Sequence, residues 1–353
     1  MEAGLSFEDG LVHEAAGPIE LLEPGRERDE VRLLVTSDGA ELAHTDFVDL
    51  PEFLSAGDVI VVNDSATLAA ALSAQLDGRR LRLHVSSAVP ATSRRLVELR
   101  LPEGLGSAPY GSAKAGDIVR LPGAGRAVLA APRLRAGKPP RLWEAELVLP
   151  SALHEYLAAY GEPIRYGYVS RAWGLDAYQT IFARVPGSSE MPSAARSFSW
   201  RLVRRLRARG VSIVSLTLHT GVASLESDEE PTPEPFHIPR ATAKAVDDAH
   251  RAGKRVIAVG TTVVRALESA MNGNGRVEAA DGVTDLIIER DRSVRSISGL
   301  LTGFHEPRAS HIKILQAVAG ENAVARSYVA AAHNGYRLHE FGDVHLLMTP
   351  DDE

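Results

Sequence analysis

Two periodicities of hydrophobic and polar positions divide the chain. Between about residues 70 and 150, apolar and polar residues alternate in short runs that clusters of glycine and proline separate, at 81–85, 96–101, 118–121 and 143–149. An alternation with period two, broken by turn residues at this spacing, is typical of small antiparallel barrels and sandwiches. We therefore predict an inserted β domain over residues 70–149, either a small antiparallel barrel or a sandwich.

After residue 150, apolar runs of strand length alternate with helical patterns. The predicted strands lie at 211–218, 255–259 and 286–288, and the predicted helices at 151–159, 199–209, 242–252, 261–271, 310–319 and 323–332. Earlier runs at 31–36, 41–47 and 59–62 predict a hairpin and a buried strand. This alternation predicts an α/β fold with a mostly parallel sheet and flanking helices. Residues 1–69 and 150–353 would form this main domain, with the β domain inserted between them.

Composition narrows the class of protein. The 353 residues are enough for about two domains, and 44% hydrophobic with 24% charged residues excludes disordered and fibrous chains. The absence of cysteine excludes a disulfide scaffold, a thiolate metal site and a cysteine nucleophile. A net charge of −7 argues against a strongly basic nucleic-acid binder. Since neither a membrane span nor a secretory signal is recognisable, we expect a cytoplasmic protein without a membrane partner.

Polar residues and glycines follow three of the predicted core strands. Because the carboxyl ends of parallel strands meet at one edge of a sheet, we expect these residues to converge there. They are Asn63, Asp64, His219, Thr220, Gly221, Gly260, Thr261 and Thr262.

Two of these positions suggest chemistry. The helix predicted after Gly260 would present free backbone N–H groups to an anion or carboxylate, and His219 has the side chain used most often for acid–base catalysis near neutral pH. Each position also has an ordinary structural interpretation. The junction at Gly260 could be a plain strand–helix turn with an ion pair between Arg265 and Glu268, and His219 could be structural.

Further histidines and arginines suggest weaker hypotheses. His305 and His311 flank Pro307, which interrupts the helical spacing that zinc enzymes need, so we expect no metal. Arg201, Arg204 and Arg205 lie on one face of a predicted helix. This face is either simply solvated or a patch that contacts the phosphates of RNA.

The order of short motifs resembles that of the S-adenosylmethionine:tRNA ribosyltransferase-isomerases of queuosine biosynthesis. The resemblance covers nearly the whole chain, and its most specific part is the block 256–262 with Arg265 and Glu268. The other matching segments are 49–51, 57–58, 62–64, 178–183, 192–194, 217–221, 303–307, 336–337 and 342–343.

The resemblance implies an α/β main domain with an inserted barrel and an unusual reaction. The ribosyl part of S-adenosylmethionine moves to the aminomethyl group of a 7-deazaguanine in tRNA and isomerises to epoxyqueuosine, and adenine and methionine are released. S-adenosylmethionine is then a co-substrate, and no metal is required. The resemblance carries a catalytic role to His219, Glu268 and His305. It carries substrate binding to Asn63, Asp64, Tyr178, Gln179, Pro192, Ser193, Thr220, Gly221, Glu234, Phe236, Gly260, Thr261, Thr262, Arg265, Phe304 and Glu306.

Several loops depart from the family pattern. Two arginines that usually follow Asn63 and Asp64 are absent, Ser197 stands where the family has a histidine, and two more histidines correspond to Glu229 and Thr232. Three hypotheses follow. The chain is a tRNA-modifying ribosyltransferase-isomerase with tRNA held near Arg201, Arg204 and Arg205, a related S-adenosylmethionine-using transferase or lyase with another acceptor, or a non-catalytic binding paralogue.

Overall fold

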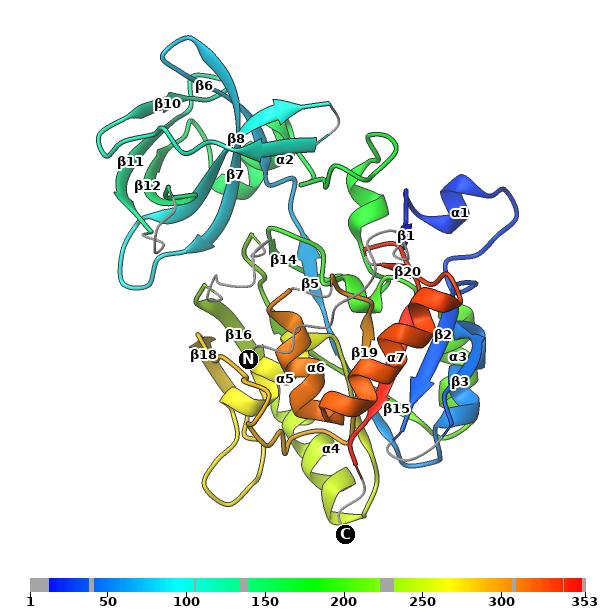
Figure 1. The fold of residues 1–353 in the computed structure, drawn as a ribbon. Helices are drawn as coiled ribbons and strands as arrows, with labels where there is room; N and C mark the ends of the chain where they lie inside the picture. The colour runs from blue at the N-terminus through cyan, green and yellow to red at the C-terminus, as the bar shows by residue number, and fades with distance from the viewer. Residues whose placement is uncertain are drawn as a thin grey trace.

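A computed structural model describes residues 13–37, 41–104, 106–133, 139–222, 232–306, 309–338 and 340–350. Figure 1 shows a β-barrel at one end of the molecule and a layered α/β body at the other.

A nine-stranded sheet in the order β18-β16-β15-β4-β17-β19-β21-β2-β3 forms the centre of the α/β body. Its middle strands are parallel and comprise β15 (Ser212–Leu218), β4 (Val59–Asn63), β17 (Val256–Val259) and β19 (Gly299–Gly303). On one side β16 (Glu234–Ile238) and β18 (Ala280–Thr284) continue it with antiparallel pairing. On the other side β21 (Val344–Met348) runs antiparallel to β19, β2 (Arg32–Thr36) runs parallel to β21, and β3 (Ala43–Asp46) closes the edge as an antiparallel hairpin.

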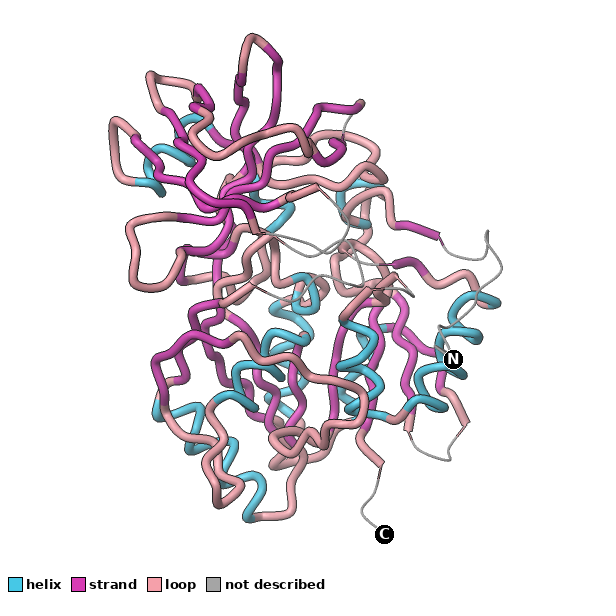
Figure 2. Tube along the Cα trace, turned by 60° about the vertical axis from the view of Figure 1, so that its left-hand side comes forward, coloured by secondary structure: helices cyan, strands magenta, loops and turns pink. Residues whose placement is uncertain are grey.

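Both faces of this sheet are buried, which explains the continuous apolar run of β4. Val59 and Val61 belong to the core under one set of helices, whereas Ile60 and Val62 belong to the core on the opposite face. The first face is covered by α4 (Arg240–Arg251), α5 (Thr261–Ser269), α6 (His311–Ala319) and α7 (Glu321–His333). The second is covered by η1 (Phe47–Phe53) and α3 (Trp200–Ala208). The helices flank the strands in Figure 2.

The second body is an antiparallel barrel. Its strands are β6 (Ala71–Leu76), β7 (Arg79–Ala88), β8 (Arg95–Glu103), β12 (Leu142–Val148), β11 (Arg126–Pro132) and β10 (Ile118–Arg120). Pairing of Arg120 with Gln75 closes it, and β9 (Gly106–Pro109) adds to β8. The predicted fold class is confirmed. The domain boundaries stay a prediction, since α2 (Leu153–Tyr160) and β13 (Gly161–Glu162), both beyond residue 149, also pack on the barrel.

Short elements connect the two bodies. β5 (Ser65–Thr67) directly follows β4 and pairs in parallel with β14 (Val185–Ser188). In the sequence, η2 (Leu175–Tyr178) and η3 (Ser193–Ala195) lie on either side of β14. Near the amino terminus, β1 (His13–Glu14) pairs with β20 (Arg337–Leu338), and α1 (Ile19–Leu22) follows.

The strand predicted at 286–288 is wrong. In its place β18 ends at Thr284, and the segment that follows is irregular. The carbonyl of Leu286 accepts a hydrogen bond from Arg265, and Ile288 is buried in the core beside α5. The apolar residues of this segment therefore cover a helix without joining the ladder.

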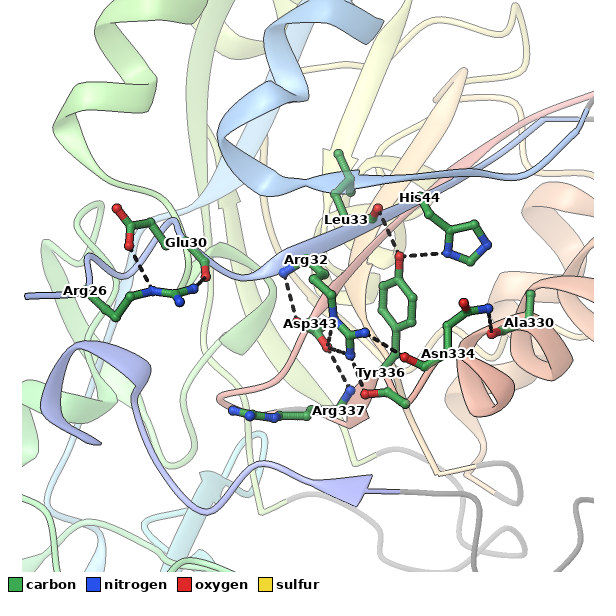
Figure 3. Close-up of polar contacts among 11 residues, drawn as sticks. Arg26, Glu30, Arg32, Leu33, His44, Ala330, Asn334, Tyr336, Arg337 and Asp343 are labelled. Atoms are coloured by element: carbon green, nitrogen blue, oxygen red, sulfur yellow. Dashed lines mark hydrogen bonds and ion pairs between the residues drawn. The ribbon is translucent and has the colours of Figure 1, made fainter. Parts of the chain in front are cut away.

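One of the family motifs turns out to secure the fold (Figure 3). The carboxylate of Asp343 accepts hydrogen bonds from the side chain and backbone N–H of Arg32 and from the backbone N–H of Arg337, at 2.8–2.9 Å. The Arg32 guanidinium also stacks 4.1 Å from the centre of the Tyr336 ring. These contacts fix β2 against the carboxyl-terminal segment.

Among the described residues, no helix is long and apolar enough to cross a membrane.

Candidate active site at the carboxyl edge of the central sheet

The sheet brings the predicted polar residues together at one edge. Strands β15, β4, β17 and β19 are parallel neighbours, so the residues after Leu218, Asn63, Val259 and Gly303 leave the sheet on the same side. The predicted convergence is therefore seen for the segments that follow these strands.

His219 is held by a pair of serines in the connecting segments. Its Nδ1 lies 2.7 Å from Oγ of Ser65, and that oxygen shares a 2.6 Å hydrogen bond with Oγ of Ser188. Ser188 Oγ also accepts from the backbone N–H of Thr220 at 3.1 Å. Gly187 provides the space, because a Cβ there would lie 2.3 Å from His219 Nδ1.

Burial keeps the His219 imidazole neutral. Its pKa is lowered mainly by burial, with Asp64 acting to raise it and Arg95 to lower it further. Arg95 belongs to β8, so a cation from the barrel lies near the histidine on the sheet edge. A neutral imidazole at pH 7 is able to accept a proton.

Asn63 and Asp64 are engaged by the protein itself. The amide of Asn63 donates to the carbonyl of Leu218 and accepts from its backbone N–H. Asp64 accepts from Arg184, Ser215 and Thr217 at 2.6–3.0 Å. Both side chains tie β4 to β15 and position the loop that carries Ser65 and His219.

Glu234 links two of the predicted site segments. One carboxylate oxygen accepts from the backbone N–H of Gly221 at 2.9 Å, and the other forms a buried ion pair with Arg265. The pairing of Arg265 with Glu268, one of our two interpretations of this helix, is thus wrong. Arg265 reaches instead across to β16 and to the carbonyl of Leu286 at 3.1 Å.

Glu268 lies at the other end of α5. Its carboxylate accepts from the backbone N–H groups of Arg295 and Ser296 at 2.9 and 2.8 Å. These residues precede β19, so they belong to the amino edge of the sheet. The structure does not bring Glu268 to His219, and its contacts are those of a residue that holds a loop.

The start of α5 lies beside a second predicted segment. Gly260 is the helix cap and has a positive φ of 94°, and its Cβ position lies 3.2 Å from Cβ of Ala194. The segment that contains Pro192 and Ser193 therefore passes beside this helix start through Ala194. Thr261 is buried and Thr262 is half-buried, so the helix start is partly open.

His305 lies near the same edge, next to the core. Its Nε2 is 3.0 Å from Oγ1 of Thr302, and its ring stacks on His311 at 4.5 Å between centroids. Burial, with a contribution from Arg265, lowers the pKa of His311 to about 4. Phe304 is buried in the core, whereas Glu306 is exposed. In the described part of the chain, no three His, Asp or Glu side chains are grouped to hold a metal ion.

The remaining predicted substrate-binding residues are Gln179, Phe236 and Tyr178. Gln179 uses both amide atoms on the backbone of Thr67, at 2.8 and 3.0 Å, and so acts as a local brace. Phe236 packs over Gly282 on the neighbouring strand. Tyr178 is buried, and its hydroxyl finds no hydrogen-bond partner among the residues that the structure describes.

Acidic residues partly neutralise the predicted basic face of α3. Arg201 pairs with Asp29 at 2.5 Å, and Arg205 donates to the carbonyl of Val48. Arg201 and Arg205 line a hollow of about 470 Å³ together with Arg26, Glu30, Asp46 and Val48. The lining has mixed charge, and Arg204, which is also exposed, does not belong to it.

Sequence reasoning missed Ser65, Ser188 and Arg95 as parts of the site. Ser65 directly follows Asp64, so the strand-end argument could have included it. Ser188 and Arg95 are separated from His219 by 31 and 124 residues, and only the pairing of β5 with β14 and the approach of the barrel bring them near.

Comparisons with known proteins agree with the motif order. The model of a family described as queuosine biosynthesis protein matches residues 18–347. The chain is 35% identical to an S-adenosylmethionine:tRNA ribosyltransferase-isomerase of Sorangium cellulosum, over 93% of this chain and 95% of the relative. An enzyme with the same name from Thermus thermophilus is 34% identical, over 94% and 96%.

A solved structure shares the fold. The crystal structure of an S-adenosylmethionine tRNA ribosyltransferase from Thermotoga maritima superposes with a TM-score of 0.52 at 23% identity, covering 97% of this chain and 98% of that one. The resemblance seen in the motifs is confirmed, and the chain belongs to the queuosine biosynthesis protein family.

Proposed function

We propose that this protein is an S-adenosylmethionine:tRNA ribosyltransferase-isomerase. It transfers the ribosyl part of S-adenosylmethionine to the aminomethyl group of a 7-deazaguanine base in tRNA, with isomerisation to epoxyqueuosine and release of adenine and methionine. Relatives that carry this enzyme name match more than nine-tenths of the chain. The observation that carries the proposal is the neutral His219 held by Ser65 at the carboxyl edge of the sheet.

The reaction needs a base near the C5′ hydrogens, which the neighbouring sulfonium acidifies. In the tautomer of His219 that donates from Nδ1 to Ser65, the lone pair on Nε2 is available for this purpose. The lowered pKa keeps the imidazole unprotonated near pH 7, and Ser65 and Ser188 fix its orientation. We therefore assign the proton transfer to His219 in preference to Glu268.

The start of α5 suits the carboxylate of the methionine part. Helix N-termini attract anions through free N–H groups and the helix dipole. Gly260 allows close approach because it has no side chain, and Thr261 and Thr262 follow with their hydroxyls. Thr220 and Ser193 lie on neighbouring loops of the same edge and complete our proposed binding surface for S-adenosylmethionine.

The basic face of α3 is the place we propose for tRNA phosphates. A second candidate function is kept because Asp29 already pairs with Arg201 on this face. With less free positive charge for RNA, the enzyme would act on a smaller acceptor with the same S-adenosylmethionine chemistry. A cytoplasmic location follows from either proposal and stays a prediction.

One experiment separates the candidates. The purified chain is incubated with S-adenosylmethionine alone, with tRNA that carries the 7-aminomethyl-7-deazaguanine base, or with the free base, and adenine and methionine are quantified. Adenine release that depends on this tRNA supports the main proposal. Release with the free base but not with tRNA favours the second candidate, and the absence of adenine under all conditions contradicts both.

The matched variants are His219→Ala and Glu268→Gln. Loss of a positioned base costs about 10²–10⁴ in rate, so His219→Ala should lose that much adenine release and still bind S-adenosylmethionine. Glu268→Gln should retain the wild-type rate within a few fold. Equal losses in the two variants would contradict the assignment of the base.

A further inference from the structure

A second group of ionisable side chains adjoins the His219 site. It consists of Tyr166, Tyr168, Tyr178, Glu190 and Glu340, and we call it the carboxylate–tyrosine cluster. Oη of Tyr166 donates to Oε2 of Glu190 at 2.8 Å, and the Tyr166 and Tyr168 rings are parallel at 5.7 Å. These residues come from four segments: the loop after β13, the η2 turn, the loop after β14, and the loop after β20.

The cluster is continuous with the candidate active site. The carbonyl of Glu190 accepts from Oγ1 of Thr220 at 2.6 Å, next to His219. The carbonyl of Tyr178 accepts from Oγ1 of Thr67 at 2.7 Å, in the strand that begins with Ser65. A ligand bound at the sheet edge can therefore extend into the cluster.

Two buried polar atoms of the cluster find no partner in the described part of the protein. Oε2 of Glu340 and Oη of Tyr178 have no hydrogen bond there, and the two residues are only 8% and 1% exposed. A buried acceptor without a partner costs about 1–3 kcal/mol, more when it is charged, so such atoms are rare unless a ligand or water completes them.

Glu340 faces the tyrosines. Its carboxylate contributes to the raised pKa of Tyr166, Tyr168 and Tyr178, after the larger effect of burial in each case. Burial and the neighbouring Glu190 in turn raise the pKa of Glu340 itself. Arg165 acts to lower the pKa of Tyr178, and its guanidinium is paired with Glu162 at 2.7 Å. The carboxylates of the cluster thus face mainly one another and the phenol rings.

The missing partner is a hydrogen-bond donor with a positive charge. A primary ammonium has three N–H donors, which can satisfy Glu340, Glu190 and the oxygen of Tyr178 together. The tyrosine faces add a cation–π attraction. A sulfonium carries charge without N–H groups and would leave the Glu340 oxygen unsatisfied.

We propose that the carboxylate–tyrosine cluster binds a primary ammonium group of a substrate. The proposal rests on the proposed function for its choice of ligands, since that reaction offers two such groups. These are the amino group of the methionine part of S-adenosylmethionine and the aminomethyl group of the acceptor base. Glu14 and Glu306 are exposed and lie close enough for their charges to interact, so an acidic surface lies near the cluster.

Titration calorimetry on the full chain tests the proposal with the variants Glu340→Gln and Tyr178→Phe. Both changes nearly preserve side-chain volume, and Glu340→Gln replaces a buried ionisable group by a neutral amide beside Glu190, so the temperature of thermal unfolding of the ligand-free protein should not fall. The matched control is Glu155→Gln, an exposed glutamate on α2. If Glu340→Gln fails to fold, Tyr178→Phe still decides the outcome.

The probes distinguish the two sources of the ammonium. S-adenosylmethionine and S-adenosylhomocysteine carry the amino group, and 5′-methylthioadenosine lacks it. The free base 7-aminomethyl-7-deazaguanine carries an ammonium, and 7-cyano-7-deazaguanine does not. We expect Glu340→Gln to weaken the binding of one set of ammonium-bearing probes, the S-adenosyl compounds or the aminomethyl base, by about 10- to 100-fold, the range of a charge-assisted hydrogen bond. The affinity for the matching probe that lacks the ammonium group should stay unchanged.

Several results would overturn the proposal. One is that wild type and both variants bind every probe equally well, and another is that the variants lose affinity equally for probes with and without an ammonium group. A third is that the variants lose affinity for S-adenosylmethionine but not for S-adenosylhomocysteine. A fourth is that the wild type binds no ammonium-bearing probe. Adenine release by the wild type is measured in parallel. Release without any effect of Glu340→Gln refutes only the ammonium site, whereas ammonium binding through Glu340 without release refutes only the proposed reaction.

Discussion

Arg265 of α5 forms a buried ion pair with Glu234 of β16, although Glu268 lies one turn away on its own helix. The pair crosses from the helix to the antiparallel flank of the sheet, and the second Glu234 oxygen holds the backbone of Gly221. Through these contacts the helix start and the loop after His219 are held by one carboxylate.

Removing one partner of this pair should strongly destabilise the protein. In Glu234→Gln the Arg265 charge stays buried without its counter-ion, which typically costs about 3–5 kcal/mol. Urea unfolding measures the loss. Adding Arg265→Met should recover part of it, because the second charge is then also removed. Lys244→Gln, in an exposed pair with Asp248, is the control, and a similar loss in control and test variants would contradict a special role for Arg265 and Glu234.

A methyl group at Gly187 should damage catalysis more than folding. The Cβ of Gly187→Ala would lie 2.3 Å from Nδ1 of His219, so the imidazole must move away from Ser65. We expect adenine release to fall by at least about tenfold, because small displacements of a catalytic group cost rate steeply. Gly273→Ala, with open space around its Cβ, is the control. Unchanged turnover in Gly187→Ala would show that the position of His219 does not matter.

The pH profile of kcat/KM should report the His219 pKa. Since burial lowers this pKa below the ordinary value of about 6.5, activity should persist below pH 6.5 and fall as His219 becomes protonated. Arg95→Gln removes a cation that disfavours the protonated imidazole, so the acid limb should move to higher pH. A limb that stays in place or moves to lower pH would argue against either the base role or the proximity of Arg95.

Much of the fold could be predicted because its signals are local. The apolar run of β4 is buried on both sides, the alternating runs form the barrel, and Ser199 and Gly210 bound α3 as capping and turn chemistry suggest. The error at 286–288 arose because apolar residues of an irregular segment cover α5. A short apolar run does not distinguish a strand from a covering loop.

The candidate site was less predictable because its partners are chosen by tertiary structure. That strand ends converge follows from parallel pairing, and this placed His219 near Asp64 in advance. Arg265 pairs with Glu234 because of the register of β16 and the direction of α5. The local spacing of Arg265 and Glu268 indicates neither of these. The cluster around Glu340 joins four segments that are distant in the sequence, and only the segment that begins at Tyr178 belongs to a family motif.

His345 should make the protein sensitive to mild acid. Its imidazole is fully buried, is hydrogen-bonded to Thr36 at 2.9 Å and is stacked on Phe304, and burial lowers its pKa to about 3. In the unfolded chain the pKa returns to about 6.5. Between these values the unfolded state binds more protons, so stability is complete above pH 6.5 and is lost as the pH falls toward 3. One such group contributes a slope of up to about 1.4 kcal/mol per pH unit.

Urea unfolding from pH 7 to 4.5 tests this contribution. The free energy of unfolding should fall less steeply with pH in the double variant Thr36→Val/His345→Phe, which keeps the stacked ring without a titrating group. Replacing the exposed His154 by Gln should leave the slope of the wild type unchanged. An identical slope in the double variant would show that the charge state of His345 does not limit the stability of the fold in acid.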